Sequence, residues 1–192
     1  MSKEKSAKYV SRAGDKLASV SVDLKLRFKD AVVLDVGSST GGFTDFALQN
    51  GAKKVTAVEL GTNQMHPKLR QNPYIDLNEK TDILNFASSE NFDVIVMDLS
   101  FVSLRKILPQ IASLAQSKTQ IIAMLKPQFE ATETQKNRGV VKNNAVRREI
   151  MKDFESWVKK LFVIVGKADS KVPGTKGNVE RFYSLKLKRK EG

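Results

Sequence analysis

Two residues of this sequence, Asp98 and Lys126, are placed where proton transfer could occur. Each directly follows an apolar segment, Phe92–Met97 and Thr119–Leu125 respectively. A charged lysine is costly to bury, so we expect Lys126 to project into a polar cleft. If the two segments are neighbouring parallel strands, Asp98 and Lys126 meet at one edge of a sheet. A general base positioned there could take a proton from a hydroxyl group and raise the rate ~10²–10⁴-fold.

Glu180 and Lys16 are the other two members of this candidate group. Glu180 lies at the start of the last predicted strand, and Lys16 lies on the first predicted helix. The charge of Lys16 would favour a neutral Lys126, whereas the carboxylates would oppose it. By spacing alone Lys16 is the weakest member, because most helical lysines are solvated. Two ordinary surface ion pairs are the alternative for the whole group.

A glycine-rich loop, Asp35-Val-Gly-Ser-Ser-Thr-Gly-Gly42, joins an apolar segment to a predicted helix. A dinucleotide fingerprint would need glycine in place of Ser39, and a P-loop would need lysine in place of Phe43, so neither pattern fits. S-adenosylmethionine requires neither residue, because it carries a methionine and a sulfonium instead of phosphates. The alternative is that Gly41 and Gly42 only allow close packing of the strand against the helix.

An acidic residue is expected to accept the ribose hydroxyls of such a cofactor. Glu59 ends the next predicted strand, close to the ~20-residue spacing of nucleotide-binding folds, although a solvated strand end is the alternative. The predicted cofactor-binding residues are Asp35, Gly37, Ser38, Gly41, Gly42, Phe43, Glu59, Asp82 and Asp98.

The segment after Asp98 argues against methylation of an exocyclic base nitrogen. That chemistry usually uses an Asp/Asn-Pro-Pro-aromatic loop, whose rigid carbonyls hold the amino group. Here Leu99 and Ser100 stand at the two proline positions. Phe101 could stack on a base or a ribose, or it could be the first apolar residue of the following helix.

Alternating strands and helices are needed to position these residues, and the sequence predicts them. The pattern favours an α/β fold with a mostly parallel, doubly wound sheet. Strands are predicted at 31–36, 54–59, 74–77, 92–98, 119–125, 162–165 and 179–187, helices at 9–28, 42–49, 64–71, 102–116 and 145–161, a short helix or loop at 82–86 and a loop at 130–143.

The composition indicates one soluble α/β domain. The chain has 192 residues, of which 41% are hydrophobic and 28% are charged. It contains no cysteine, which excludes disulfides and thiolate metal sites and suits a cytoplasmic protein. No apolar run approaches the ~18 residues needed to cross a bilayer. The single histidine, His66, and scattered carboxylates predict no metal site.

The net charge of +12 favours a nucleic-acid partner, because clustered Lys and Arg neutralise phosphates. The alternatives are a merely basic surface or adhesion to acidic membranes. Candidate phosphate contacts include the run Lys186–Lys190. The predicted RNA-binding residues are Arg12, Phe101, Arg147, Arg148, Lys188 and Arg189.

The sequence resembles the FtsJ-like ribose methyltransferases, and in particular the TlyA, or haemolysin A, family. The resemblance is carried by Tyr9-Val-Ser-Arg-Ala-Gly-Asp-Lys-Leu17, Asp35–Asp45, Asp98–Ser103, Leu125–Glu130 and Lys176–Glu180. It implies a Rossmann-like class I methyltransferase, a three-layer sandwich around a seven-stranded sheet with an antiparallel last strand. It also implies S-adenosylmethionine as cofactor and 2′-O-methylation of ribosomal RNA at cytidine, in free RNA or in ribosomal subunits. The family's Lys-Asp-Lys-Glu catalytic tetrad falls on Lys16, Asp98, Lys126 and Glu180.

The sequence departs from this family at its start. The family usually carries an S4-like RNA-binding domain before Tyr9, whereas eight residues precede Tyr9 here. We expect residues 1–8 to be a linker and 9–192 to form the methyltransferase domain. A module that binds cofactor and RNA without catalysis is one alternative, but it would have no reason to keep Lys126 and Glu180 in a cleft. A membrane-lytic haemolysin is another, but no spanning helix is predicted, and the Leu and Phe residues pattern into a globular core.

Overall fold

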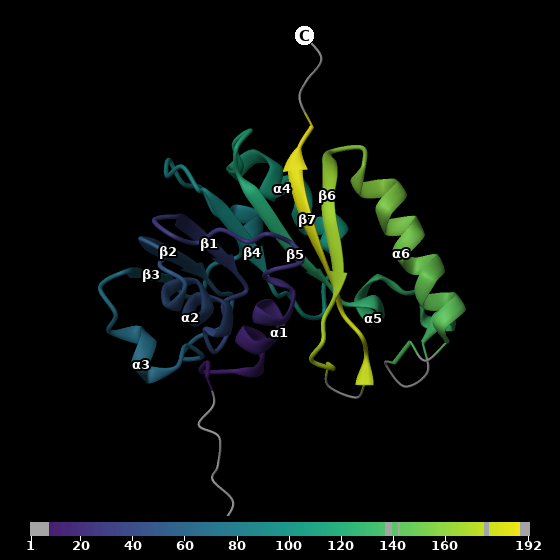
Figure 1. The fold of residues 1–192 in the computed structure, drawn as a ribbon, viewed down its shortest axis with the longest axis horizontal. Coiled ribbons are helices and arrows are strands. Elements are labelled where there is room, and N and C mark those ends of the chain that lie inside the picture. Colours follow the sequence, from purple (N-terminus) through teal and green to yellow (C-terminus); the bar gives the residue numbers. More distant parts are fainter. Residues whose placement is uncertain (1–7, 137–139, 142, 175–176, 189–192) are drawn as a thin grey trace, which may run out of the picture.

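The computed structural model describes residues 8–136, 140–141, 143–174 and 177–188, and it shows a single sheet with helices packed on both faces (Figure 1). The strands are β1 (Val32–Val36), β2 (Lys54–Val58), β3 (Ile75–Asn78), β4 (Val94–Met97), β5 (Gln120–Leu125), β6 (Phe162–Asp169) and β7 (Arg181–Leu187). The helices are α1 (Arg12–Val20), α2 (Gly42–Gln49), α3 (Pro67–Arg70), α4 (Leu104–Leu114), α5 (Pro127–Glu130) and α6 (Asn144–Val158), with 3₁₀ turns η1 (Ile83–Asn85) and η2 (Glu133–Gln135).

The sheet has seven strands in the order β3-β2-β1-β4-β5-β7-β6. The pairs between β1, β2, β3, β4 and β5 are all parallel, whereas β7 is antiparallel to both of its neighbours. The predicted seven-stranded, mostly parallel sheet with an antiparallel last strand is therefore confirmed. The strand order reverses between β1 and β4, and ligands of doubly wound sheets bind beside such a switch point.

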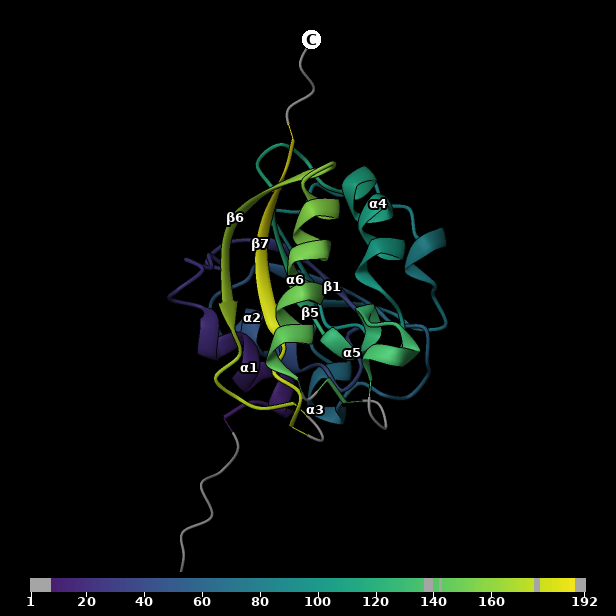
Figure 2. The ribbon, with the colours of Figure 1, turned by 90° about the vertical axis from the view of Figure 1, so that its right-hand side faces the viewer.

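Each face of the sheet has its own apolar core, which confirms the three-layer arrangement. On one face, α4 and α6 pack their Ile107, Leu108 and Phe154 against the central strands. On the other face, α1 and α2 contribute Leu17, Phe43 and other apolar side chains. Figure 2 shows the two helical layers on opposite sides of β6 and β7.

The first helix is shorter than predicted. It ends at Val20, and Lys25 adopts a left-handed backbone with φ of 51°. Leu24 and Phe28 are nevertheless buried, at 5% and 3% exposure. Their helix-like spacing therefore reflects burial from an irregular loop, a case that periodicity alone does not separate from a helix.

Other boundaries also differ from the prediction, chiefly those of β6 and of the loop 130–143. β6 extends from Phe162 to Asp169, four residues beyond the predicted end, because a register shift at Gly166 lets its pairing with β7 continue. The predicted loop 130–143 contains the 3₁₀ turn η2, and α5 ends at Glu130 just before it.

Candidate active site

The ends of β1, β4 and β5 and the start of β7 form one edge of the sheet, and the candidate group lies there. The backbone N–H of Asp98 donates to the carbonyl of Val36 at 3.2 Å, which fixes the end of β4 beside β1. In the antiparallel pair of β5 and β7, Leu125 faces Arg181. The next two positions, Lys126 and Glu180, therefore face each other just beyond the ladder.

Lys126 is paired with Asp98, as the sequence predicted. Its Nζ lies 2.7 Å from Asp98 Oδ1 and also donates to Ser100 Oγ at 2.7 Å. The two side chains of the ion pair keep 11% and 18% of their surface exposed. Lys126 is mostly buried, forms an ion pair with a carboxylate and donates a hydrogen bond to a hydroxyl, so it can hold or transfer a proton at a fixed position.

Lys16 pairs with Glu180 across the same edge. The Lys16 Nζ lies 2.8 Å from Glu180 Oε1, and the side chains are 11% and 4% exposed. The solvated reading of Lys16 is thus wrong. The other carboxylate oxygen, Glu180 Oε2, is buried without a hydrogen-bond partner among the described residues. Lys16 thus holds one oxygen of Glu180, while the other oxygen remains available as a hydrogen-bond acceptor.

Close packing of α1 on α2 brings Lys16 to this position. A Cβ added at Gly14 would lie 2.9 Å from the carbonyl oxygen of Gly42 and 2.5 Å from Tyr9 Cβ. The two helices therefore meet backbone to backbone, which only glycine permits at these positions. We refer to this contact as the Gly14–Gly42 contact.

The glycine loop follows β1 and wraps a small cavity. The N–H groups of Gly37 and Ser38 donate to the carbonyl of Val58, and Gly41 adopts a φ of 93° that disfavours other residues. The cavity encloses about 60 Å³ and is lined by Ser11, Ala13, Asp35, Gly37, Ser38, Ser39, Thr40, Gly42, Phe43 and Asp98.

Asp35 is the buried charge of this cavity. Burial raises the pKa of Asp35 to about 7, although its hydrogen bond from Thr44 Oγ1 at 2.6 Å acts in the opposite direction. The second oxygen, Asp35 Oδ1, has no hydrogen-bond partner within the described residues, and neither has the buried Ser38 Oγ. Two buried polar atoms thus face the cavity with bonding capacity to spare.

Glu59 and Asp82 lie at the β2 side of the same loop. The carboxylate of Glu59 accepts hydrogen bonds from the N–H groups of Ser39 at 2.9 Å and Gly61 at 2.8 Å. Asp82 caps η1 by accepting from the N–H of Leu84. The backbone also joins them, because the N–H of Thr81 donates to the carbonyl of Glu59. The Glu59 carboxylate therefore contacts the glycine loop at Ser39, and Asp82 follows Thr81, which is bonded to the backbone of Glu59.

These residues fit S-adenosylmethionine better than a phosphorylated ligand. The cavity presents the carboxylates of Asp35 and Asp98 and no lysine or arginine, so it would repel phosphates and attract a sulfonium or an ammonium group. The unsatisfied oxygens of Asp35 and Ser38 suit a ligand that donates hydrogen bonds. Because the enclosed volume is small, much of the ligand would lie along the open rim.

Phe101 lies beside Lys126 on an exposed, strained loop. Its side chain is 92% exposed, its φ is 65°, and its ring lies 5.2 Å from the ring of Phe129. The interpretation of Phe101 as a helix anchor is wrong, because α4 begins at Leu104 with Ser103 as its N-cap. A left-handed backbone at an exposed aromatic residue costs free energy and is characteristic of functional sites.

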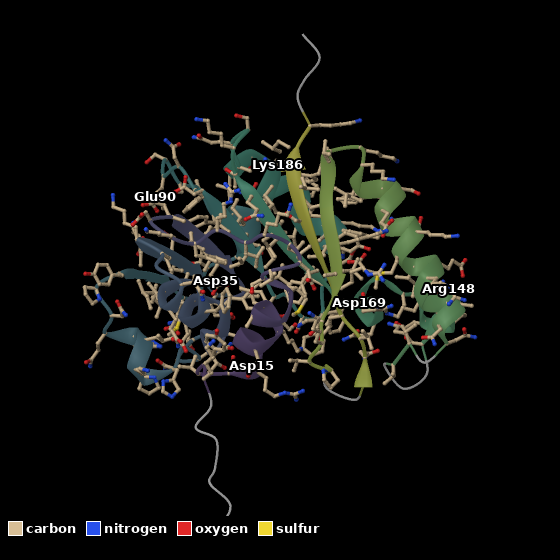
Figure 3. All side chains as sticks on the ribbon, viewed as in Figure 1. Asp15, Asp35, Glu90, Arg148, Asp169 and Lys186 are labelled. Carbon is tan, nitrogen blue, oxygen red and sulfur yellow. The ribbon has the colours of Figure 1, made fainter. Side chains whose placement is uncertain are left out.

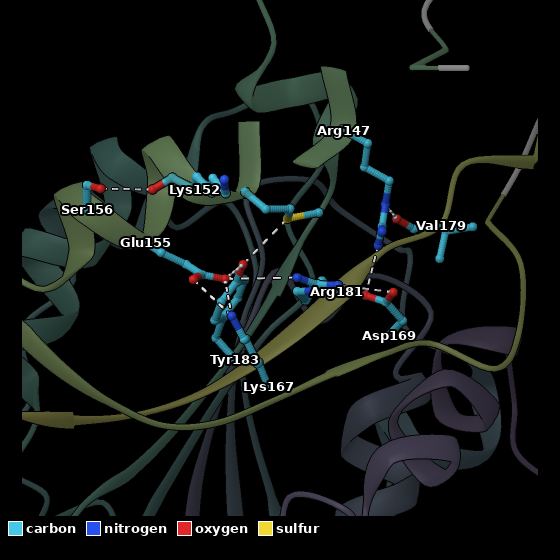
Figure 4. Close-up of polar contacts among 10 residues, drawn as sticks. Arg147, Lys152, Glu155, Ser156, Lys167, Asp169, Val179, Arg181 and Tyr183 are labelled. Atoms are coloured by element: carbon cyan, nitrogen blue, oxygen red, sulfur yellow. Dashed lines mark hydrogen bonds and ion pairs between the residues drawn. The ribbon is translucent and has the colours of Figure 1, made fainter. Parts of the chain in front are cut away.

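The predicted phosphate contacts do not gather at one place. Arg12 is exposed and donates to the carbonyl of Pro173. Arg147 is engaged elsewhere, with Asp169 at 2.8 Å and the carbonyl of Val179 (Figure 4). Arg148 and Lys188 are exposed and form no ion pair with other described residues, and Arg189 lies outside the described residues.

Several site residues were not predicted from the sequence, among them Ser100, Thr44 and Ser11. Ser100 accepts a hydrogen bond from Lys126, Thr44 donates one to Asp35, and Ser11 lines the cavity. Ser100 and Thr44 lie within two residues of the predicted motifs, so their positions were a usable signal. Ser11 reaches the cavity only through the packing of α1, which local sequence does not reveal.

The fold and the site together define a class: this is a Rossmann-like methyltransferase that uses S-adenosylmethionine. The chain belongs to the FtsJ-like methyltransferase family, whose model matches residues 9–187. Within the described residues, no helix is long and apolar enough to span a membrane.

Relatives and solved structures agree with this assignment. The chain is 41% identical to the 23S rRNA (cytidine-2′-O)-methyltransferase TlyA of Campylobacter jejuni, covering 91% of this chain and 70% of that one. It is 37% identical to Hemolysin A of Brachyspira hyodysenteriae, covering 90% and 75%. A solved Streptococcus thermophilus structure, provisionally described as a hemolysin, superimposes with a TM-score of 0.91 at 35% identity and covers 96% of this chain and 69% of that one.

Proposed function

We propose that this enzyme methylates a ribose 2′-hydroxyl of ribosomal RNA, at a cytidine. The observation that carries the proposal is the pair of lysine–carboxylate contacts, Lys126–Asp98 and Lys16–Glu180, at the edge where the cofactor cavity opens. A hydroxyl group is a poor nucleophile, so a group that removes its proton is what the reaction needs. A substrate of this kind also places the enzyme in the cytoplasm, with RNA or ribosomal subunits as its partners.

Lys126 is the proposed general base. Lys126 lies beside the cofactor cavity, because its ion-pair partner Asp98 lines that cavity. Asp98 and Ser100 hold the Lys126 Nζ in one position, so a lone pair on the neutral amine would point in a fixed direction. Positioning of this kind accounts for much of the advantage of an enzymatic base.

Glu180 and Lys16 would act on the substrate side of this base. Glu180 faces Lys126 across the start of β7, and its Oε2 has no hydrogen-bond partner among described residues. That oxygen could accept a hydrogen bond from the ribose hydroxyl or orient the lysine. Lys16 holds the other carboxylate oxygen, Glu180 Oε1, in an ion pair and could contact the adjacent phosphate.

The cofactor supplies an electrophilic methyl group on a sulfonium when it is bound. Asp35 and Ser38 would hold its methionine portion with their unsatisfied oxygens, and Glu59 would accept the ribose hydroxyls, with Asp82 beside the adenine. The carboxylate of Asp98 would favour the positive charge of the sulfonium. Phe43 supports the loop from beneath, because its ring is buried.

The nature of the substrate rests on the relatives and on charge. The Campylobacter jejuni relative is a 23S rRNA cytidine-2′-O-methyltransferase, and one from Mycobacterium tuberculosis, 33% identical, is a 16S/23S rRNA cytidine-2′-O-methyltransferase. The net charge of +12 suits a polyanionic substrate. The exposed ring of Phe101 offers a surface on which the base could stack.

Two measurements test the proposal. Calorimetric titration with S-adenosylmethionine should give binding, and titrations with NAD and ATP should give none. Incubation of ribosomal RNA with cofactor labelled in the methyl group should then give one modified cytidine. Nuclease digestion and mass spectrometry distinguish a methylated ribose from a methylated base. Label on the base, or no cofactor binding, would contradict the proposal, and a Lys126→Ala protein is the matched control.

A further inference from the structure

A second cavity lies at the opposite edge of the sheet from the active site. It has a volume of about 600 Å³ and lies at the amino ends of β4 and β5, beside the carboxyl end of β7. Its polar floor is formed by Gln120 and Ser184, and its walls include Leu24 and Val165. We call it the basal groove. Figure 3 shows Lys186, one of its lining residues, at the far end of β7 from Asp169.

Cations dominate the lining of the basal groove. Five basic residues face three carboxylates, Asp23, Asp30 and Asp93. Asp23 is already paired with Lys171, which lies outside the lining. No ion pair with a described carboxylate is formed by any of the five basic residues, which are Lys25, Arg27, Lys29, Lys118 and Lys186. The groove thus concentrates unpaired positive charge in a concave surface, where the field is stronger than on a flat one.

The groove is built by specific packing of the loop after α1 over the sheet. The Gln120 amide donates to the carbonyl of Leu24 and to Ser184 Oγ, so one side chain ties the loop to two strands. Gly166 stands at the register shift of β6, and a Cβ there would lie 3.2 Å from Leu24 Cδ2. Lys25 and Asp30, on this loop, have positive φ values of 51° and 60°.

The basal groove also accounts for a sequence signal that the active site does not use. The C-terminal basic run was a predicted phosphate contact, and its first residue, Lys186, lines the groove. β5 separates the two edges: Gln120 lines the groove and Lys126 follows the other end. At ~3.3 Å per residue, these edges are ~20 Å apart, which is too far for one nucleotide and within reach of a folded RNA.

From these observations we infer that the basal groove binds the phosphodiester backbone of the RNA at a point remote from the methylated ribose. This inference rests on the proposed function, since it assumes an RNA substrate. The groove takes phosphates rather than a neutral ligand because its cations have no carboxylate partner among described residues. It contributes to affinity and to the choice of a folded RNA over a short strand, and it takes no part in the chemistry.

The test compares two triple variants that remove equal charge. One carries Lys25→Gln, Arg27→Gln and Lys29→Gln in the groove. The control carries Lys152→Gln, Lys159→Gln and Lys160→Gln, which are exposed in the middle of α6 and just after its end. Binding of a labelled, folded ribosomal RNA fragment is measured by fluorescence anisotropy over a range of salt concentrations. The groove variant should bind at least tenfold more weakly, with a salt slope lower by ~2, because each lost phosphate contact removes ~0.7–0.9.

The outcomes distinguish a specific effect of the groove on RNA binding from a general effect of lost positive charge. They also distinguish failure of this inference from failure of the proposed function. Equal losses in both triple variants, or an unchanged salt slope in the groove variant, would overturn the inference. So would retained RNA binding with lost binding to phosphatidylglycerol vesicles, which would indicate a membrane ligand. Both variants should keep the wild-type cofactor affinity and the kcat at saturating RNA. Because the readout is binding, it decides the inference even if the wild-type protein methylates no ribosomal RNA.

Discussion

Two clusters of charged side chains lie close to the start of β7, and they differ in how completely their carboxylate oxygens are hydrogen-bonded. The first is the active-site group with its two lysine–carboxylate pairs. The second, the α6 network, joins α6 to β6 and β7 through Arg147, Glu155, Lys167, Asp169, Arg181 and Tyr183 (Figure 4). Both are charged, mostly sheltered and close to the ends of strands, so composition alone does not distinguish them.

Every carboxylate oxygen of the α6 network has a donor. Asp169 accepts from Arg181 Nε at 2.6 Å and from Arg147 at 2.8 Å, and Glu155 accepts from Lys167 and from the Tyr183 hydroxyl. Burial opposes the charged forms of Asp169 and Glu155, but these hydrogen bonds outweigh it and lower both pKa values.

The active site instead retains unsatisfied acceptors. Asp35 Oδ1, Ser38 Oγ and Glu180 Oε2 are buried without hydrogen-bond partners among the described residues, and burial raises the pKa of Asp35 to about 7. Unsatisfied buried acceptors cost stability, so a fold keeps them where a ligand will satisfy them. Between these two clusters, complete hydrogen bonding accompanies a structural role and incomplete hydrogen bonding accompanies the proposed binding role.

The largest expected effect is on catalysis. Lys126→Ala should lower kcat by at least ~10²-fold, because the proposed base is lost. Cofactor affinity should stay within about threefold of wild type, since Lys126 does not line the cavity. Single-turnover methyl transfer and calorimetry measure the two quantities. Loss of cofactor binding together with turnover would remove Lys126 from the role of base.

The next effect is on the pH dependence of stability. The folded-state pKa of Asp35, about 7, exceeds its ordinary value of 3.8. The folded protein therefore keeps this proton up to about pH 7, and ionising the group above that pH costs stability. Asp35→Asn should be more stable than wild type at pH 8, by up to ~4 kcal/mol at 1.36 kcal/mol per pKa unit.

The difference between Asp35→Asn and wild type should shrink as the pH falls and should vanish only below about pH 3, where Asp35 is protonated in both states, because its ordinary pKa is 3.8. Denaturant unfolding of the two proteins from about pH 3 to pH 8 measures it. The same variant should bind the cofactor more weakly. A constant stability difference across this range would show that Asp35 is not held protonated by its surroundings.

A smaller loss of stability is expected in the α6 network. Glu155→Ala removes the shared acceptor of Lys167 and Tyr183, and it should lower the free energy of unfolding by ~2 kcal/mol. Because the folded-state pKa of Glu155 is lowered, its contribution is present at neutral pH and is lost as the pH falls below about 4.5. Chemical denaturation at pH 7 and pH 3 tests both statements, and kcat should not change.

The smallest expected effect comes from a single hydroxyl. Tyr183→Phe keeps the buried ring and removes one hydrogen bond to Glu155, at 3.0 Å. Unfolding should be easier by ~1 kcal/mol, which is the usual net value of such a bond. Thermal melting detects this difference. A fall in methyl transfer would instead show that the two clusters are coupled, and it would contradict a purely structural role for the α6 network.

The sequence allowed most of the fold and the active-site group to be predicted, for physical reasons. Apolar runs such as those ending at Met97 and Leu125 are buried on both faces, and such runs identify parallel strands. Lys16 could not be placed by spacing, because its position depends on the Gly14–Gly42 contact between helices. Arg147 looked like a phosphate contact because its sequence neighbours are basic, but its partner Asp169 is 22 residues away.

The Gly14–Gly42 contact has a consequence for the local unfolding of α1 and α2. With no side chain between them to adjust, α1 and α2 are expected to unfold as one cooperative unit, so their amide protons should exchange with solvent at a common rate. A cofactor that orders the glycine loop would then slow exchange along α1 as well, including at Lys16. Protection from exchange would pass from the loop to the Lys16–Glu180 pair through backbone contact alone.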